Sequence, residues 1–339
     1  MRDRARGKAA AVLTAALTAV LLPLGSARAA EATVTRYLTG NPADVSPPLF
    51  GPAHDLGGGS TDVDAALQWM IDQVRGCAGP ACAAKLDVVV LRSSGGAGYN
   101  DYIFAMNGVD SVETLVVTGA ADADAAEVEE TVRRAEVVFF AGGDQCDYVR
   151  FFKGTRVEGA VDSVYARGGG VGGTSAGTAI QGDFGYDACA GSVASAEALA
   201  DPYHGRVTFT YGWFAWPHLE QTITDTHFVA RDRMGRTLAF LARQIEDGRA
   251  RKALAVAVDE VTSVVVDRKG LATVMGAGPA YFVLADHRPE VCRPGAPLSY
   301  SGYKVWKVAA GGTFDLARRP TEGYYAVSVT RGALAADPY

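Results

Sequence analysis

Short apolar runs alternate with amphipathic segments along the first half of the chain. Continuous branched runs, typical of strands buried on both faces, lie at residues 86–91, 114–118 and 137–141. Helical segments precede or follow them, at residues 61–74, 125–135, 144–152 and 156–165. Thr61 is the expected N-cap of the first helix, with Asp64 in the capping position three residues later. This alternation predicts an α/β fold with a doubly wound, mostly parallel sheet.

The pattern changes after residue 200. Residues 222–224 form a short apolar strand and residues 236–245 a helix, whereas 253–267 and 271–284 alternate and are joined by Arg-Lys-Gly, which predicts a hairpin. Residues 303–316 and 324–329 are expected to be closing strands. We therefore predict a single α/β domain over residues 30–339, with a C-terminal β-rich extension from about residue 300.

The first 29 residues have the order of a secretory signal peptide. A basic segment precedes the apolar run 9–24, and Ala27-Arg28-Ala29 follows as a small-x-small cleavage site. The run is shorter than the ~20 apolar residues that a spanning helix needs, so a membrane anchor is the less favoured alternative. We predict a secreted protein without a membrane contact after cleavage.

Charge and cysteine content narrow the function further. The net charge is −6 and no basic stripe is present, so nucleic acid is not an expected partner. In an oxidising compartment some of the five cysteines are expected to pair. Cys77 and Cys82 flank a turn, Ala-Gly-Pro-Ala, and are the predicted disulfide, whereas the pairing of Cys146, Cys189 and Cys292 stays open. No cysteine or histidine spacing is typical of zinc, so no metal is expected.

Residues 173–177, Gly-Thr-Ser-Ala-Gly, match the G-x-S-x-G nucleophile elbow. The motif lies between a predicted strand and a short predicted helix, 176–180, as a strained strand-to-helix turn requires. The glycines leave room for the turn, and free N–H groups at the helix start can stabilise an oxyanion. Ser175 is therefore the candidate nucleophile.

A serine nucleophile needs a base, and the chain has five histidines. His54, His204, His218 and His287 fall in segments that resemble loops or turns. His227 follows the apolar strand 222–224, and open α/β sheets present functional side chains at strand ends. Position favours His227 but does not by itself separate a base from a structural histidine.

Several blocks, in this order along the chain, resemble one family of serine peptidases. They are Gly142-Gly143-Asp144-Gln145, the elbow, Asp225-Thr226-His227-Phe228 with Arg231, Arg233 and Arg236, Val258-Asp259-Glu260, and the closing segment 307–316. Together they resemble the cyanophycinase and dipeptidase E family over most of residues 86–319. The resemblance implies a flavodoxin-like, class I glutamine-amidotransferase-like fold without a cofactor. Many relatives are dimers, which is compatible with a homodimer here.

The resemblance also implies a role for individual residues. Ser175 would be the nucleophile, His227 the general base and Glu260 the acid that orients the imidazole. The backbone N–H groups of Gly143 and Ala176 would form the oxyanion hole. Substrate contacts are implied for Gln145, Asp225, Thr226, Arg231, Arg233 and Arg236. Guanidinium groups suit carboxylates because they bind both oxygens, although a solvated basic helix face is the competing interpretation.

The implied substrate is cyanophycin, a poly-aspartate with arginine on each side chain, which exo-cleavage would convert to β-aspartyl-arginine dipeptides. Thr226 stands where cyanophycinases usually carry glutamine, and Thr178 replaces a common alanine, so another acidic or β-linked peptide is an alternative substrate. An α/β-hydrolase-type esterase would instead use Ser175, Asp259 or Glu260, and His287. Strands follow His287, which disfavours that order. A secreted, non-catalytic binding protein of the same fold is the third interpretation.

Overall fold

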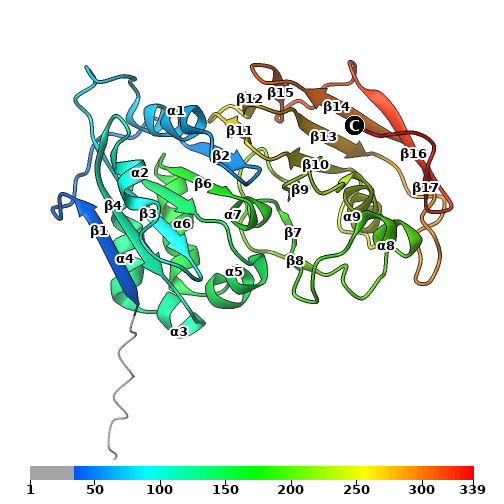
Figure 1. The fold of residues 1–339 in the computed structure, drawn as a ribbon, viewed down its shortest axis with the longest axis horizontal. Helices are drawn as coiled ribbons and strands as arrows, with labels where there is room; N and C mark the ends of the chain where they lie inside the picture. Colours follow the sequence, from blue (N-terminus) through cyan, green and yellow to red (C-terminus); the bar gives the residue numbers. More distant parts are fainter. Residues whose placement is uncertain (1–33) are drawn as a thin grey trace, which may run out of the picture. The chain divides into compact units, whose positions relative to one another are not determined.

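The computed structural model describes residues 34–339, which belong to one compact unit (Figure 1). The predicted signal peptide lies outside the described residues. The strands form two sheets. The first contains β1 Thr35–Gly40, β2 Ala53–Gly57, β3 Leu86–Arg92, β4 Val109–Val116, β5 Val137–Phe140, β6 Gly170–Thr174, β11 Thr262–Val266, β12 Leu271–Gly276 and β15 Thr313–Asp315. The second contains β7 Phe184–Tyr186, β8 Phe209–Tyr211, β9 Thr222–Asp225, β10 Ala253–Val258, β13 Ala280–Ala285, β14 Tyr300–Val308, β16 Tyr325–Thr330 and β17 Ala333–Leu334.

The first sheet carries the predicted parallel core. Its order is β1-β4-β3-β5-β6-β2-β11-β12-β15, and the strands from β4 to β2 are parallel to one another. Antiparallel strands complete both edges. The predicted α/β fold with a mostly parallel, flavodoxin-like sheet is therefore confirmed.

Helices cover both faces of this sheet because its strands are apolar on both sides. Val88 and Val90 of β3 pack in the core that contains α1, whereas Val89 and Leu91 pack in the core that contains α4 and α6. The helices are α1 Asp64–Arg75, α2 Asn100–Phe104, α3 Ala120–Ala123, α4 Ala126–Arg134, α5 Gln145–Phe152, α6 Arg156–Ala166, α7 Ala176–Ala179, α8 Ser195–Ala200 and α9 Met234–Glu246. No helix among residues 34–339 is long and apolar enough to cross a membrane.

The second sheet extends further back along the chain than a C-terminal extension from about residue 300. Its order is β17-β16-β14-β13-β10-β9-β7-β8, so it already includes strands from residue 184 onward. Ala255 and Ala257 of β10 pack under α8 and α9, while Leu254 and Val256 point to the other face and join the core of the first sheet.

The predicted hairpin is real but is shared between the two sheets. Residues 253–267 form two strands, β10 and β11, and residues 271–284 likewise divide into β12 and β13. β11 pairs with β12 in the first sheet, and β10 pairs with β13 in the second. The chain changes sheets at Asp259–Val261, where Val261 has a φ of 55°. This crossing places residues 259 and 260 at the junction between the sheets.

Three local expectations were wrong. The strand expected at residues 114–118 is β4, which begins at Val109 and ends at Val116. The first helix begins at Asp64 rather than after Thr61, with Val63 at its N-cap, and the Asp64 carboxylate accepts a hydrogen bond from the Tyr102 hydroxyl at 2.8 Å. His54 does not lie in a loop but in β2, where its ring is 1% exposed and stacks on Tyr165. The Pro- and Gly-rich sequence before β2 is typical of a loop, so this short central strand could not be recognised from the sequence.

Candidate active site

The turn at Ser175 has the strained geometry of a nucleophile elbow. Ser175 lies between β6 and α7 with φ 52° and ψ −114°, and its backbone N–H donates to the Gly57 carbonyl at 3.1 Å. A Cβ on Gly173 would lie 2.7 Å from the Gly177 carbonyl carbon, and a Cβ on Gly177 would overlap the Phe140 carbonyl. Both glycines of the motif are therefore required by close packing, which leaves the half-buried serine hydroxyl at the end of the parallel strands.

His227 and Glu260 continue from Ser175 in a hydrogen-bonded chain. The Ser175 Oγ lies 2.7 Å from His227 Nε2, and His227 Nδ1 lies 2.6 Å from Glu260 Oε1. With the Nδ1 proton held by Glu260, the imidazole can accept the serine proton at Nε2. This is the order of groups that activates a hydroxyl for nucleophilic attack.

The backbone around His227 fixes the ring in place. His227 has a φ of 47°, and its N–H donates to the Gly58 carbonyl at 2.8 Å. Gly59, the residue after Gly58, has a φ of 103°, and a Cβ on Gly59 would lie 2.5 Å from His227 Cε1. Gly58 therefore holds the backbone of His227 through its carbonyl, and Gly59 leaves room for the imidazole ring.

Asp259 and Glu260, at the crossing between the two sheets, have different hydrogen-bond partners. The Asp259 carboxylate accepts the backbone N–H groups of Val229 and Ala230, both at 3.0 Å, and so fixes the turn that follows His227. Glu260 is thereby the acid that meets the imidazole. Of the two acids that the α/β-hydrolase interpretation allowed, the structure pairs Glu260 with His227 rather than with His287.

Burial and charge determine the protonation state of His227. Burial is the main cause that lowers the pKa of His227, and the positive charges of Arg231 and Arg233 lower it further, whereas the hydrogen bond that the ring donates to Glu260 raises it. A histidine whose pKa lies below 6.5 is neutral at pH 7. The ring is therefore ready to act as a base at that pH.

The loop after β5 lies beside the nucleophile. A Cβ on Gly142 would be 3.6 Å from the Ser175 Cβ, and one on Gly143 would be 3.8 Å from Ser93 Oγ. Ala176 is the first residue of α7, so its N–H has no acceptor four residues earlier within the helix. Gln145 begins α5 directly after this loop and is half-buried. The loop that contains Gly142 and Gly143 therefore lies beside Ser175, and the oxyanion and substrate contacts of Gly143, Ala176 and Gln145 stay predictions.

The three arginines after His227 have unequal surroundings. Arg236 is 2% exposed, and its guanidinium donates to both carboxylate oxygens of Asp225, at 2.9 Å to Oδ2, and to Ser192 Oγ at 3.2 Å. Burial opposes ionisation of Asp225, but Arg236 and Arg233 outweigh it and lower its pKa. Asp225 and Arg236 are thus engaged with each other, which differs from the expectation that both face the substrate.

Arg233 and Arg231 lie progressively nearer the surface. The Arg233 guanidinium donates to the carbonyl of buried Thr226 at 2.7 Å, and burial lowers the pKa of Arg233 to about 10. The Arg231 side chain is 54% exposed, and its Nε lies 3.9 Å from Glu260 Oε1. Arg231 therefore has the most freedom to meet a ligand, and Arg233 has one side engaged.

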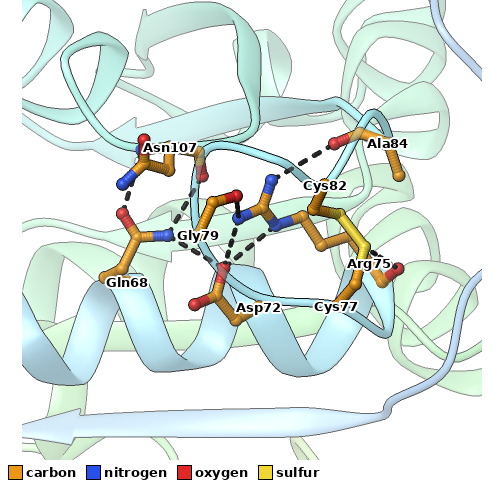
Figure 2. Close-up of a disulfide and its surroundings, with 8 residues drawn as sticks. All are labelled: Gln68, Asp72, Arg75, Cys77, Gly79, Cys82, Ala84 and Asn107. Atoms are coloured by element: carbon orange, nitrogen blue, oxygen red, sulfur yellow. Dashed lines mark hydrogen bonds and ion pairs between the residues drawn. A yellow bond between two sulfur atoms is a disulfide. The ribbon is translucent and has the colours of Figure 1, made fainter.

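Two disulfides are present in the described part of the chain. Cys77 and Cys82 are bonded, as the turn between them predicts, and Figure 2 shows the buried Arg75 inside the same loop. Its guanidinium donates to the Asp72 carboxylate at 2.7 Å and to the Gly79 carbonyl at 3.1 Å. The second disulfide joins Cys146 to Cys189, and Cys292 is free and buried.

Sequence reasoning missed three contributors to this site: Gly59, Asp259 as the anchor of the His227 turn, and the Cys146–Cys189 bond. The run of three glycines at residues 57–59 was the available signal for Gly59. The other two depend on contacts between distant segments. His287 is half-exposed, with its Nδ1 3.0 Å from Asp286, and the structure gives it no contact with Ser175.

The chain is similar in sequence to known cyanophycinases and in fold to a known peptidase. No family model matches the chain. It is 27% identical over 223 residues to a cyanophycinase from Nostoc sp. (strain PCC 7120 / SAG 25.82 / UTEX 2576), which covers 64% of the chain and 69% of that protein. It is 28% identical to a cyanophycinase from Synechococcus elongatus over 55% of the chain and 52% of that protein. The crystal structure of a peptidase from an acI-B1 Actinobacterium shares the fold, with a TM-score of 0.53 at 16% identity over 79% of this chain and 98% of that one.

Proposed function

We propose that this chain is a serine-type peptidase related to the cyanophycinases, and that Ser175, His227 and Glu260 form its catalytic triad. The observation that carries this proposal is the continuous chain of hydrogen-bonding distances, 2.7 Å from Ser175 Oγ to His227 Nε2 and 2.6 Å from His227 Nδ1 to Glu260 Oε1. A histidine with only a structural function would not require a strained serine hydroxyl at one ring nitrogen and a carboxylate at the other.

The residues would perform acyl transfer in two stages. His227 Nε2 takes the proton of Ser175 Oγ as the oxygen attacks the scissile carbonyl, and Glu260 stabilises the imidazolium that forms. The N–H groups of Gly143 and Ala176 donate to the developing oxyanion. His227 then gives its proton to the departing amine, which leaves an acyl-enzyme on Ser175. Water activated by the same imidazole releases the acyl group and restores the serine.

The proposed substrate is cyanophycin, cleaved stepwise to β-aspartyl-arginine dipeptides. Its support is the family relationship together with the cationic groups that follow His227. Arg231 is exposed and Arg233 is half-buried, so both can approach a substrate carboxylate, while buried Arg236 holds Asp225 beneath them. A carboxylate at a chain end would gain two guanidinium partners at this position, which favours exo-cleavage.

We also propose that the protein is secreted. The order of basic, apolar and small residues at the N-terminus supports export, and two disulfides are typical of proteins that fold in an oxidising compartment. Assembly as a homodimer stays a prediction, which light scattering on the purified protein would check.

The test of the proposed function is incubation of the mature protein with insoluble cyanophycin, followed by mass spectrometry of the soluble products. The β-aspartyl-arginine dipeptide is expected from the wild-type protein and from His287→Ala, but not from His227→Ala. Loss of activity in His287→Ala alone would favour the α/β-hydrolase mechanism. Cleavage of an unrelated acidic peptide without any dipeptide from cyanophycin would refute the substrate and leave the triad standing.

A further inference from the structure

The Cys146–Cys189 disulfide joins the two sides of the candidate site. Cys146 is the second residue of α5, directly after Gln145, and the Asp144 side chain accepts its backbone N–H at 2.8 Å. Cys189 lies in the loop after β7, in the second sheet. The bond brings the two Cα atoms to 4.9 Å. It therefore fastens the start of α5, which contains Gln145 and follows the Gly143 loop, to the loop after β7.

The loop at Cys189 is itself part of the arginine cluster. Three residues after Cys189, the Ser192 hydroxyl accepts a hydrogen bond from Arg236 at 3.2 Å. The Arg236 guanidinium also lies 5.1 Å from the ring centroid of Tyr186, the last residue of β7. The segment that contains Cys189 thus contacts the same arginine that holds Asp225. The disulfide consequently connects the oxyanion side of the site with its carboxylate-binding side.

The other hydrogen bonds of the Cys189 loop are local or lie on the side of the second sheet. The Cys189 backbone N–H donates to Asp187 at 3.0 Å, the Gly191 N–H donates to the Ala188 carbonyl at 2.8 Å, and Asp187 accepts the Thr210 hydroxyl of β8 at 3.0 Å. Ser175 lies between residues 146 and 189 in the sequence, so the covalent loop of 43 residues encloses the nucleophile elbow. A cross-link at this position limits how far the oxyanion loop can move from the second sheet.

We propose that the Cys146–Cys189 disulfide is a positioning element for catalysis, and that the peptidase reaches full activity only when this bond is oxidised. The proposal rests on the proposed function of Ser175. Cys146 and Cys189 touch no substrate; they act through Gly143 and Gln145. Catalysis depends steeply on placement, since a shift of about 1 Å in positioning groups costs on the order of 10²-fold in rate.

The bond is accessible to a reductant from one side. Cys146 is 4% exposed, but Cys189 is exposed. A dithiol such as dithiothreitol would attack the exposed sulfur, form a mixed disulfide and then close to its own cyclic disulfide. Two electrons and two protons are transferred, so Cys146 and Cys189 become thiols. The remaining cysteine, Cys292, is buried, and burial raises its pKa to about 12, which keeps its thiol neutral and slow to exchange.

The other disulfide supplies a matched control. Cys77 and Cys82 also include one exposed member, and their loop is held independently by the Arg75 hydrogen bonds (Figure 2). The variants to compare are Cys146→Ser/Cys189→Ser and Cys77→Ser/Cys82→Ser. Both lose one cross-link, but only the first releases a segment next to Ser175.

The readout is the rate at which a fluorophosphonate probe labels Ser175, because this reaction needs the triad and the oxyanion hole but not cyanophycin. We expect Cys146→Ser/Cys189→Ser to be labelled about 10- to 100-fold more slowly than the wild type, with Cys77→Ser/Cys82→Ser unchanged. The pH midpoint of labelling should stay the same in all three proteins, because His227 and Glu260 are not held by either disulfide. A general loss of structure would move that midpoint or the circular dichroism spectrum.

Reduction and reoxidation of the folded wild-type protein keep the test valid if the double variant does not fold. Labelling should slow in step with alkylation of Cys146 and Cys189, measured by peptide mass spectrometry, and recover with oxidised glutathione. Equal labelling rates in the reduced and oxidised proteins would overturn the positioning role while leaving the triad intact. Absence of labelling in the oxidised wild type would instead refute the chemistry of Ser175, and this proposal with it.

Discussion

The nucleophile and its base are built in two different ways. Ser175 belongs to one continuous segment, in which β6, a strained turn and α7 follow each other within the parallel sheet. His227 and Glu260 come from separate places, the end of β9 and the crossing between β10 and β11, 33 residues apart in sequence. They meet Ser175 only because the hairpin changes sheets beside β2.

This difference separates local from non-local determinants of the site. The glycines on each side of Ser175 can be recognised within the five residues of the G-x-S-x-G pattern, although the backbone that leaves no room for a side chain at Gly177 is that of Phe140 in β5. His227 has no such local signature, and its orientation depends on Gly58, Gly59 and Asp259 from other segments. Mutations at the elbow should therefore remove the nucleophile, whereas mutations at the crossing between the sheets should change the orientation of His227.

Ser175→Ala is expected to have the largest effect. Removal of the hydroxyl abolishes the acyl-enzyme, so kcat should fall by about 10⁴- to 10⁶-fold. The half-buried site tolerates the smaller side chain, so the circular dichroism spectrum should not change. Near-normal turnover by a folded Ser175→Ala protein would show that the elbow is not the nucleophile.

Glu260→Gln tests the crossing. The amide keeps the shape of the side chain but no longer stabilises the imidazolium, so activity should fall on the order of 10⁴-fold, as for comparable triad acids. The control is Glu246→Gln, a surface glutamate whose side chain is 27% exposed and pairs with Arg288, against 32% for Glu260. Equal activity of the two variants would mean that Glu260 only packs beside His227.

Gly59→Ala should disturb the base without touching the triad itself. The new methyl would lie 2.5 Å from His227 Cε1, so the ring must move, and a displacement of about 1 Å should cost on the order of 10²-fold in kcat. Gly79→Ala is the matched control, because Gly79 also has a positive φ, 75°, but no atom lies within 4 Å of the added methyl. Both variants carry backbone strain, so a difference in activity between them reports on the histidine.

Arg231→Ala should give the smallest effect, a shift in pH dependence. The charge of Arg231 lowers the pKa of His227, so its removal should raise that pKa and move the acid limb of activity to higher pH. The direction follows because the base works only when neutral, and a higher pKa protonates it at a higher pH. Fluorophosphonate labelling measures this without a contribution from substrate capture. Arg134→Ala, on a surface helix, should leave the limb in place.

The sequence predicted the first sheet well because its signals are local. Apolar runs such as 86–91 and 137–141 became β3 and β5 within one residue, and the elbow was found at its correct place. The crossing at residues 259–261 could not be predicted from periodicity, because β10 and β11 are both buried and the alternation continues across the change of sheet. Within the first sheet, β2 was not recognised for a different reason: a five-residue strand among prolines and glycines has little pattern of its own.

The site was predictable where the residue type alone determines the chemistry. It was less predictable where a residue's function depends on which side chains contact it. The family resemblance singled out His227 and Glu260 before their contact was visible. It did not reveal that Arg236 is engaged by Asp225, because a guanidinium group suits a buried carboxylate as well as it suits the carboxylate of a substrate. The Cys146–Cys189 pairing was equally hidden, since an odd cysteine count leaves several connectivities open.

The hairpin that spans both sheets has a consequence for how the molecule loses its structure. Neither sheet can melt alone, since β10 leads directly into β11 and β12 into β13, each pair of strands is split between the two sheets, and all four strands contribute to one core. Heating should therefore produce one cooperative transition in calorimetry rather than two domain-like steps. Inactivation and melting are then expected to coincide, because the seam that would have to open is the place where Glu260 meets His227.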